Sequence, residues 1–295
     1  ARFRRQKTLY LLHTITAILE RQPGPWVLLK GAGYIAQDPP FSHGRLPADV
    51  DLMVPRASLD GIEQRLLDAG WEFEKNDPYD QHYYRAWSHE LPPMIAAGQA
   101  MELDLHHTIL PPVGRIKPDT ARLFADAVPV PGLPFHVLSP QDQVLHAVVH
   151  LVYDSDFVGR LRDLLDIDAL FRRLPLSDLA ARQALVERAR LHGMEQPLHL
   201  AAQLSRSWFD TPGCDALVTE VAVVASAFYG RSIPAMANRV LGPPNGQDGS
   251  DRSRRTAALL LEARSHWLRM PPWLLAYHTA SKGVRSLAQW KARRE

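Results

Sequence analysis

Two aspartates, Asp49 and Asp51, lie two residues apart inside the apolar segment 46–54. Because side chains alternate along a strand, both carboxylates would project from one face of it, and Val50 and Leu52 from the other. Mg²⁺ prefers oxygen ligands and usually binds one or two carboxylates together with substrate phosphates. The spacing therefore predicts a divalent-metal site of the kind used in phosphoryl or nucleotidyl transfer.

A second acidic strand is expected over residues 101–109. Alternation places Glu102, Asp104 and His106 on one face and apolar side chains on the other. We expect Asp104 to be the third metal ligand, with Glu102 as its alternative, although an ordinary strand with a solvent-exposed face would show the same pattern. Three acids on adjacent strands would hold two Mg²⁺ ions roughly 3.5–4 Å apart. Catalysis would then consist mainly of positioning and charge neutralisation.

A phosphate-binding turn is expected between the first strand and the helix that follows it. Gly31 lets the backbone approach a phosphate closely, and the N–H groups at a helix start point toward it. Lys30 in this turn and Arg45 in the next loop would add positive charge for a triphosphate, unless both are ordinary surface charges. Residues 31–36 also match the dinucleotide-binding pattern G-x-G-x-x-A, but the prolines at 39–40 end the helix too early for that fold.

Other polar residues have simpler interpretations. His146 and His150 share one helix face, but without a further ligand they are expected to be packed or hydrogen-bonded rather than to bind zinc. Arg162 would either reach a phosphate or pair with Asp166, four residues later on the same helix. His106 would orient a carboxylate or accept a proton from the acceptor hydroxyl.

Hydrophobic periodicity and turn residues divide the chain into two parts. Strands are expected over residues 26–30, 49–54, 71–74, 82–87 and 101–109. Helices are expected over residues 5–20, 31–37, 58–69, 118–127, 140–153, 159–173, 177–192, 196–208, 215–229 and 253–270, with a connector at 128–134 and a loop at 242–251. The fold class is therefore α+β: a catalytic domain with a small mixed sheet at residues 1–135, and a helical domain with a basic C-terminal tail at residues 136–295.

The overall composition is that of a globular protein, with 295 residues of which 46% are apolar and 22% charged. The single cysteine, Cys214, excludes an internal disulfide framework and fits a reducing compartment. We find no signal peptide and no stretch of about 20 apolar residues, so we expect a cytoplasmic protein without an integral membrane segment. Lys and Arg are concentrated in segments 1–7 and 251–295. We expect solvated helix faces there, with Trp267 and Trp273 at core-like spacing, rather than a nucleic-acid or membrane surface.

In their order, these motifs resemble the DNA polymerase β-like nucleotidyltransferase superfamily, and most closely a bacterial group described only as nucleotidyltransferase family proteins. The likeness extends over about residues 26–173 and depends on the segments 29–31, 45–54, 102–106, 146–150 and 162–168. The resemblance implies that Asp49, Asp51 and Asp104 are the metal ligands and that Gly31 forms the phosphate turn. Two features depart from the usual pattern: Ala32 stands where Gly or Ser is common, and the loop 33–48 is longer.

The expected activity is a Mg²⁺-dependent transfer of a nucleoside monophosphate from an NTP to a hydroxyl or phosphate acceptor, with release of pyrophosphate. The acceptor would be a small molecule, a peptide or protein, or an RNA, and the sequence does not distinguish these. Two alternatives stay open. One is a non-catalytic nucleotide-binding or regulatory protein on the same fold, and the other is a toxin-like transferase that acts on tRNA or protein.

Overall fold

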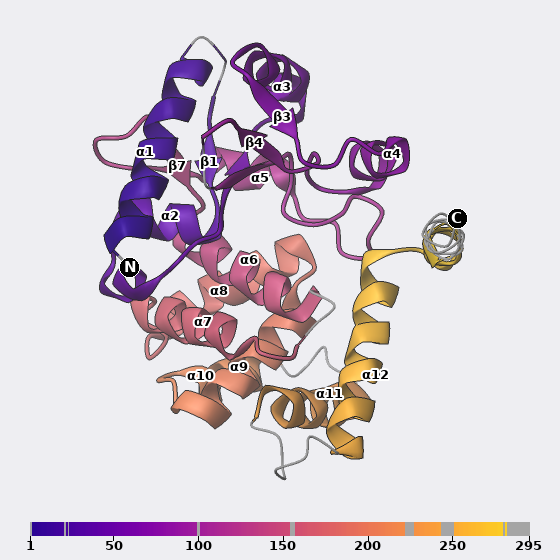
Figure 1. Cartoon of the computed structure of the whole chain (residues 1–295). Helices are drawn as coiled ribbons and strands as arrows, with labels where there is room; N and C mark the ends of the chain where they lie inside the picture. Colours follow the sequence, from indigo (N-terminus) through magenta and orange to yellow (C-terminus); the bar gives the residue numbers. More distant parts are fainter. Residues whose placement is uncertain are drawn as a thin grey trace.

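The computed structural model describes residues 2–20, 22, 24–98, 101–153, 157–221, 227–242, 251–279 and 281. Within these residues, seven strands form one mixed sheet. Helices α1 (Arg2–Leu19) and α3 (Leu59–Asp68) lie on one side of the sheet, and helices from the second half of the chain lie on the other (Figure 1). The expected α+β fold with a helical C-terminal half is therefore confirmed.

The sheet has the strand order β3-β4-β5-β2-β1-β7-β6. Its strands are β1 (Val27–Leu28), β2 (Asp49–Met53), β3 (Trp71–Phe73), β4 (Met94–Ala96), β5 (Glu102–His106), β6 (Val128–Pro129) and β7 (His136–Val137). β2 runs parallel to β5, and β1 parallel to β7, while the remaining neighbours are antiparallel. The two acidic strands are thus direct neighbours in the sheet, as expected from the sequence.

The remaining helices agree largely with the sequence pattern. They are α2 (Lys30–Gln37), α4 (Pro78–Trp87), α5 (Thr120–Ala125), α6 (Pro140–Tyr153), α7 (Leu161–Arg173), α8 (Leu179–His192), α9 (Glu195–Phe209), α10 (Cys214–Val221), α11 (Ala227–Leu241) and α12 (Arg252–Arg269), with short 3₁₀ turns at Pro40–Gly44 and Arg56–Ser58. Of the expected helix 215–229, residues 215–221 lie in α10 and residues 227–229 in α11, while residues 222–226 lie outside the described residues. Most of the expected loop 242–251 lies outside the described residues.

The strand expected over residues 82–87 is also wrong, because these residues belong to α4. Asp77 caps this helix by accepting hydrogen bonds from the backbone N–H groups of Tyr79 and Asp80, and Pro78 occupies its first turn. In addition, β4 lies where the sequence analysis predicts no strand, and β6 lies in the expected connector 128–134. β6 forms one edge of the sheet, and β4 lies between β5 and the other edge strand, β3.

A hydrophobic core covers each face of the sheet. Alternating residues of β2 and β5, including Val50, Leu52, Leu103 and Leu105, pack with α1 and α3 in one cluster. Since neighbouring residues in a strand point to opposite faces, the acids of β2 and β5 face the helical half of the molecule. β7 extends the sheet just past residue 135, and the division into two domains there stays a prediction.

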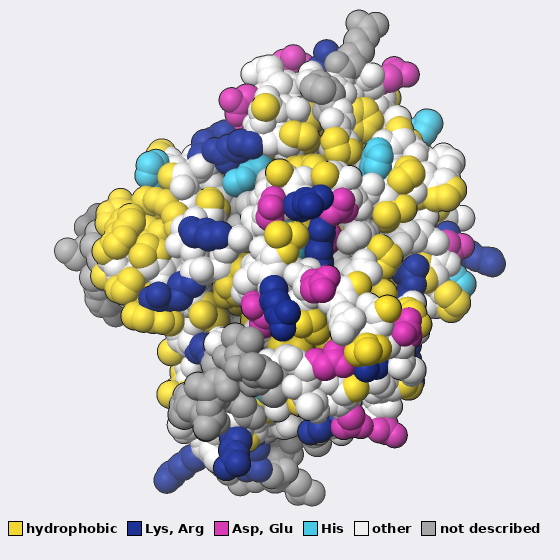
Figure 2. Space-filling model, turned by 180° about the vertical axis from the view of Figure 1, so that it is seen from behind, with side chains coloured by type: hydrophobic (Ala, Val, Ile, Leu, Met, Phe, Trp, Pro, Cys, Tyr) yellow, Lys and Arg dark blue, Asp and Glu magenta, His cyan; other side chains and the backbone are white. Residues whose placement is uncertain are grey.

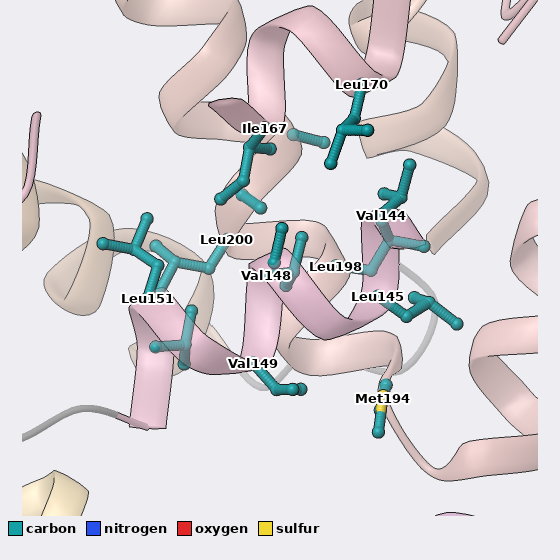
Figure 3. Packing of buried hydrophobic residues seen from close by; sticks show 14 of the residues in the cluster. Val144, Leu145, Val148, Val149, Leu151, Ile167, Leu170, Met194, Leu198 and Leu200 are labelled. Atoms are coloured by element: carbon teal, nitrogen blue, oxygen red, sulfur yellow. The ribbon is translucent and has the colours of Figure 1, made fainter. Parts of the chain in front are cut away.

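Helix α6 is buried along nearly its whole length and lies between the sheet and the other helices. Figure 3 shows its apolar side chains, among them Val144 and Val148, close to Ile167 of α7 and Leu198 of α9. Met53 at the end of β2 belongs to the same cluster. This continuous packing fixes α6 opposite the acidic face of the sheet.

The aromatic residues at the C-terminal end of the described chain are largely exposed. Trp267 and Trp273, expected at core-like positions, are 50% and 62% exposed, so that expectation is wrong. Trp273 and Tyr277 instead contact Trp87 of α4, with ring centroids 6.5 and 5.9 Å apart. Hydrophobic side chains gather on this side of the molecule, at the left of Figure 2. Among the helices that the structure describes, none has the length and hydropathy of a membrane span.

Candidate active site

The parallel pairing of β2 and β5 sets the expected acids side by side. Asp49 is opposite Glu102, and Asp51 is opposite Asp104, in the register of the two strands. Their apolar neighbours are buried against α1 and α3, and a shift of one residue would move the acids into that core. The core on the far face therefore determines that the acids face α6.

An open pocket of about 220 Å³ lies between these strands and the helical half. Its residues on the sheet side are Lys30, Asp49, Asp51 and Asp104; those on the helical side are His146, Val149, His150 and Tyr153 of α6 and Arg269 of α12; the remaining wall is formed by His89, Glu90, Ile109, Leu110 and Pro111. Three of the residues expected at the site, Gly31, Arg45 and Glu102, do not line this pocket. Of the two candidates for the third carboxylate, it is therefore Asp104 that faces the pocket together with Asp49 and Asp51.

Asp51 is the most firmly held of the three acids. Its Oδ1 accepts a hydrogen bond from Lys30 Nζ at 3.3 Å and lies 2.9 Å from His106 Nε2. Burial alone would raise the pKa of Asp51, but the charge of Lys30 and the hydrogen bond from His106 hold that pKa well below its usual range. Both contacts use Oδ1, which leaves Oδ2 without a hydrogen bond among the described residues. His106 thus orients the carboxylate of Asp51, which is the first of the two roles expected for it.

Asp49 and Asp104 have the opposite electrostatic environment. Burial, followed by the negative charge of Asp51, raises the pKa of Asp49 and raises that of Asp104 to about 7. Oδ1 of Asp104 is buried and has no hydrogen-bond partner among the residues that the structure describes. Buried polar atoms are normally paired, so an oxygen of this kind, beside two further carboxylates, fits a site for a divalent cation.

The turn at Lys30 joins β1 to α2 in a constrained conformation. Lys30 has a φ of 39°, which is uncommon for a residue with a side chain. Gly33 follows in the first turn of α2, where a Cβ atom would lie 2.8 Å from the carbonyl oxygen of Leu28. The close packing of α2 on β1 requires glycine at this position and places the Lys30 ammonium group beside Asp51. The charge of Asp51 raises the pKa of Lys30, although burial alone would lower it.

Arg45 lies outside the pocket and forms an ion pair with Asp166 of α7. Its guanidinium carbon is also 5.2 Å from the ring centroid of Tyr34. Both side chains of the ion pair are mostly buried, with exposed fractions of 16% for Arg45 and 13% for Asp166. Asp166 was expected to be a partner of Arg162 if that residue did not bind phosphate; the structure pairs Asp166 with Arg45 instead.

His89 and Glu90 are pocket residues that sequence analysis missed. They lie in an extended segment beside the end of β5, where His107 N donates to the His89 carbonyl and Glu90 pairs with His106. Glu90 Oε2 lies 3.4 Å from His106 Nε2 and 3.7 Å from His89 Nε2. Ligand atoms of these three side chains lie within 4.8 Å of one another. Such a nitrogen-containing set suits Zn²⁺ better than Mg²⁺. No local spacing motif marks these residues in the sequence.

The histidines of α6 contribute neutral imidazoles to the opposite wall. Burial, followed by the charge of Lys30, lowers the pKa of His146 to about 3 and that of His150 well below its ordinary value. Near neutral pH both rings can therefore form hydrogen bonds without adding positive charge. Both histidines line the pocket, and the expectation that they are packed or hydrogen-bonded rather than zinc ligands stays a prediction.

Comparisons with known proteins bear on the whole arrangement. A search of curated proteins and a search of solved structures return no significant match. A family model with the description "Uncharacterised nucleotidyltransferase" matches residues 1–210, which is more than half of the chain. The matched range contains the three aspartates, the turn at Lys30 and α6, and it ends before α12. The chain therefore belongs to this family of uncharacterised nucleotidyltransferases.

Proposed function

We propose that this chain is a metal-dependent enzyme that transfers a nucleoside monophosphate from an NTP to a hydroxyl or phosphate acceptor, with pyrophosphate as the second product. One observation carries the proposal. Asp49, Asp51 and Asp104 line a single open pocket from two paired strands, and a buried oxygen of Asp104 has no hydrogen-bond partner in the described part of the chain. Membership of a nucleotidyltransferase family supports this assignment.

The three aspartates have the donor atoms that two Mg²⁺ ions require. Asp49 and Asp51 would be ligands of both ions, and Asp104 of the ion nearer the attacking group. Burial, followed by the negative charge of Asp51, raises the pKa values of Asp49 and Asp104, and a divalent cation would offset both effects by stabilising the carboxylates. When bound, such ions neutralise phosphate charge and lower the pKa of an attacking hydroxyl.

The other residues of the pocket would position the substrates. Lys30 holds Asp51 in place and lies beside the start of α2, where it would also attract phosphate oxygens. Apolar side chains such as Val149 and Leu110 line part of the same pocket and would exclude water from the reacting groups. The role expected for Arg45 at the triphosphate stays a prediction, and it requires Arg45 to leave Asp166.

The acceptor would enter from the side of the pocket formed by α6. Neutral His146 and His150 line this wall, and an imidazole without charge can accept a hydrogen bond from an acceptor hydroxyl. His106 is less suited to accept its proton, because Nε2 of His106 is already bonded to Asp51. This arrangement favours no acceptor class among small molecules, peptides and RNA.

The direct test is transfer of label from α-labelled NTPs, with Mg²⁺ or Mn²⁺, to molecules in a cell extract. We expect a labelled product with the unaltered chain and none with the double variant Asp49→Asn and Asp51→Asn. Asp104→Asn should lower labelling by about a hundredfold or more, since a metal ligand supplies several kcal/mol to the transition state. Glu102→Gln, on the same strand but outside the pocket, is the matched control and should keep near-normal labelling.

Persistence of labelling in the double variant would remove these aspartates from the mechanism. Thermal stabilisation by an NTP without any labelled product would indicate the non-catalytic nucleotide-binding alternative. Label recovered in tRNA or in protein would identify the toxin-like alternative. Equal loss of activity in Glu102→Gln and Asp104→Asn would contradict the choice of Asp104 as the third ligand.

A further inference from the structure

The C-terminal end of α12 is held against the loop that follows β5 (Figure 1). The backbone N–H of Arg115 in this loop donates to the carbonyl of Leu268 at 2.9 Å, and Nε of Arg115 donates to the carbonyl of Trp267 at 2.9 Å. Gly114 of this loop also lies close to α12, since a Cβ atom there would be 3.4 Å from the Leu268 oxygen. Met270, the next residue after α12, is buried. The last turn of α12 therefore has a defined position at the rim of the pocket.

This position places Arg269, the last residue of α12, in the pocket wall. Its guanidinium has no ion pair or hydrogen bond with any residue that the structure describes. His89, another residue of the pocket, is close enough to Arg269 for the two side chains to interact electrostatically: burial is the main cause that lowers the pKa of His89, and the positive charge of Arg269 adds to it. The side chain is half-buried, so its charge is partly removed from water without a protein partner.

Lys30 and Arg45, the two cations expected to bind a triphosphate, are already paired. Lys30 lines the pocket but is bonded to Asp51, and Arg45 is bonded to Asp166 away from the pocket. A guanidinium group binds phosphate through two parallel N–H···O bonds, and it keeps its charge at any relevant pH. Arg269 is thus the pocket cation, within the described residues, whose hydrogen-bonding capacity is not used by the protein itself.

We propose that Arg269 binds the phosphate groups of a polyphosphate ligand, so that α12 completes a site whose acids come from the sheet. The ligand class is a nucleoside triphosphate or the pyrophosphate released from it. This inference rests on the proposed function for the identity of the ligand. It also goes beyond the family, because Arg269 lies outside the matched residues 1–210.

The test is the binding of inorganic tripolyphosphate with Mg²⁺ to the full chain, measured by calorimetry at two salt concentrations. Arg269→Gln should weaken binding by about tenfold to a hundredfold, as expected for loss of hydrogen bonds to a charged group, and should reduce the salt dependence. Arg269→Lys should restore only part of the affinity, because an ammonium group lacks the paired geometry. Arg252→Gln, an exposed arginine at the other end of α12, is the matched control and should bind like the unaltered chain. Thermal unfolding of each variant shows whether α12 remains docked.

The outcomes separate this inference from the proposed function. Tripolyphosphate binding that is absent in the unaltered chain, or equal in Arg269→Gln, overturns the inference. Wild-type labelling rates in Arg269→Gln overturn it too, while the proposed transferase activity stands. Binding that depends on Arg269, together with no labelled product from any NTP, supports the phosphate site and rejects the transferase.

Discussion

Asp104→Asn tests whether the pocket holds an acid that ionises only near neutral pH. Burial and the charge of Asp51 raise the pKa of Asp104 to about 7, from an ordinary value of 3.8. An acid with a higher pKa in the folded chain binds protons more tightly there than in the unfolded chain. The stability that this acid contributes is therefore fully present below the pKa that it has in the unfolded chain, and it is lost as the pH rises through the pKa that it has in the folded chain.

The size of the effect follows from these two pKa values. Between about pH 5 and about pH 8, the linkage relation gives a loss of about 2.5 kcal/mol in the free energy of unfolding for one such acid. The pocket is open to solvent, so screening reduces this to about 1–2.5 kcal/mol. Asparagine does not titrate, and the variant should lack this part of the pH dependence.

The assay is urea unfolding of both proteins at these two pH values with a chelator present. The unaltered chain should lose more stability toward high pH than Asp104→Asn, and saturating Mg²⁺ should recover that loss in the unaltered chain only. Asp60→Asn, at an exposed position of α3, is the matched control and should keep the full pH dependence. Identical pH dependence in the unaltered chain and Asp104→Asn, or equal stabilisation of both by Mg²⁺, would refute the reasoning.

Two further predictions concern the structure that supports the site. Gly33→Ala should lower the free energy of unfolding by about 1–3 kcal/mol, because the added Cβ would lie 2.8 Å from a carbonyl oxygen of β1. Gly44→Ala, with open space around it, should have little effect in the same urea titration. Asp166→Asn should lower the free energy of unfolding by about 2–3 kcal/mol, because it leaves the mostly buried Arg45 without its acid. Asp215→Asn should lower it by less than about 1 kcal/mol, because Asp215, the ion-pair partner of Arg206, is 80% exposed. Equal losses of stability in the two variants would show that the Arg45–Asp166 ion pair stabilises the contact between the two halves of the chain no more than an exposed ion pair would.

The parts of the site that could be predicted from the sequence are those with a local cause. Asp49, Asp51 and Asp104 share one side of the sheet because strand alternation is strict and their neighbours are apolar. The order of a glycine turn and two acidic strands also pointed to the family that the chain belongs to. The wrong prediction at residues 82–87 has a local cause as well: aromatic residues favour strands, but Asp77 followed by Pro78 is a helix-start signal, and here the helix start outweighs the strand preference.

The remaining pocket residues come from contacts that no local pattern encodes. Glu90 reaches His106 only because its segment pairs with the end of β5, and Arg269 reaches the pocket only because Arg115 holds the end of α12. Arg45 is an example of the opposite error: it lies near the acids in the sequence, but its ion pair is with Asp166 in a helix of the second half of the chain. Strand alternation can therefore identify the groups that we propose as metal ligands, whereas the cations that we propose for substrate binding depend on how the helical half packs against the sheet. It follows that variants of the α12 contact should change phosphate binding while leaving the three carboxylates in register.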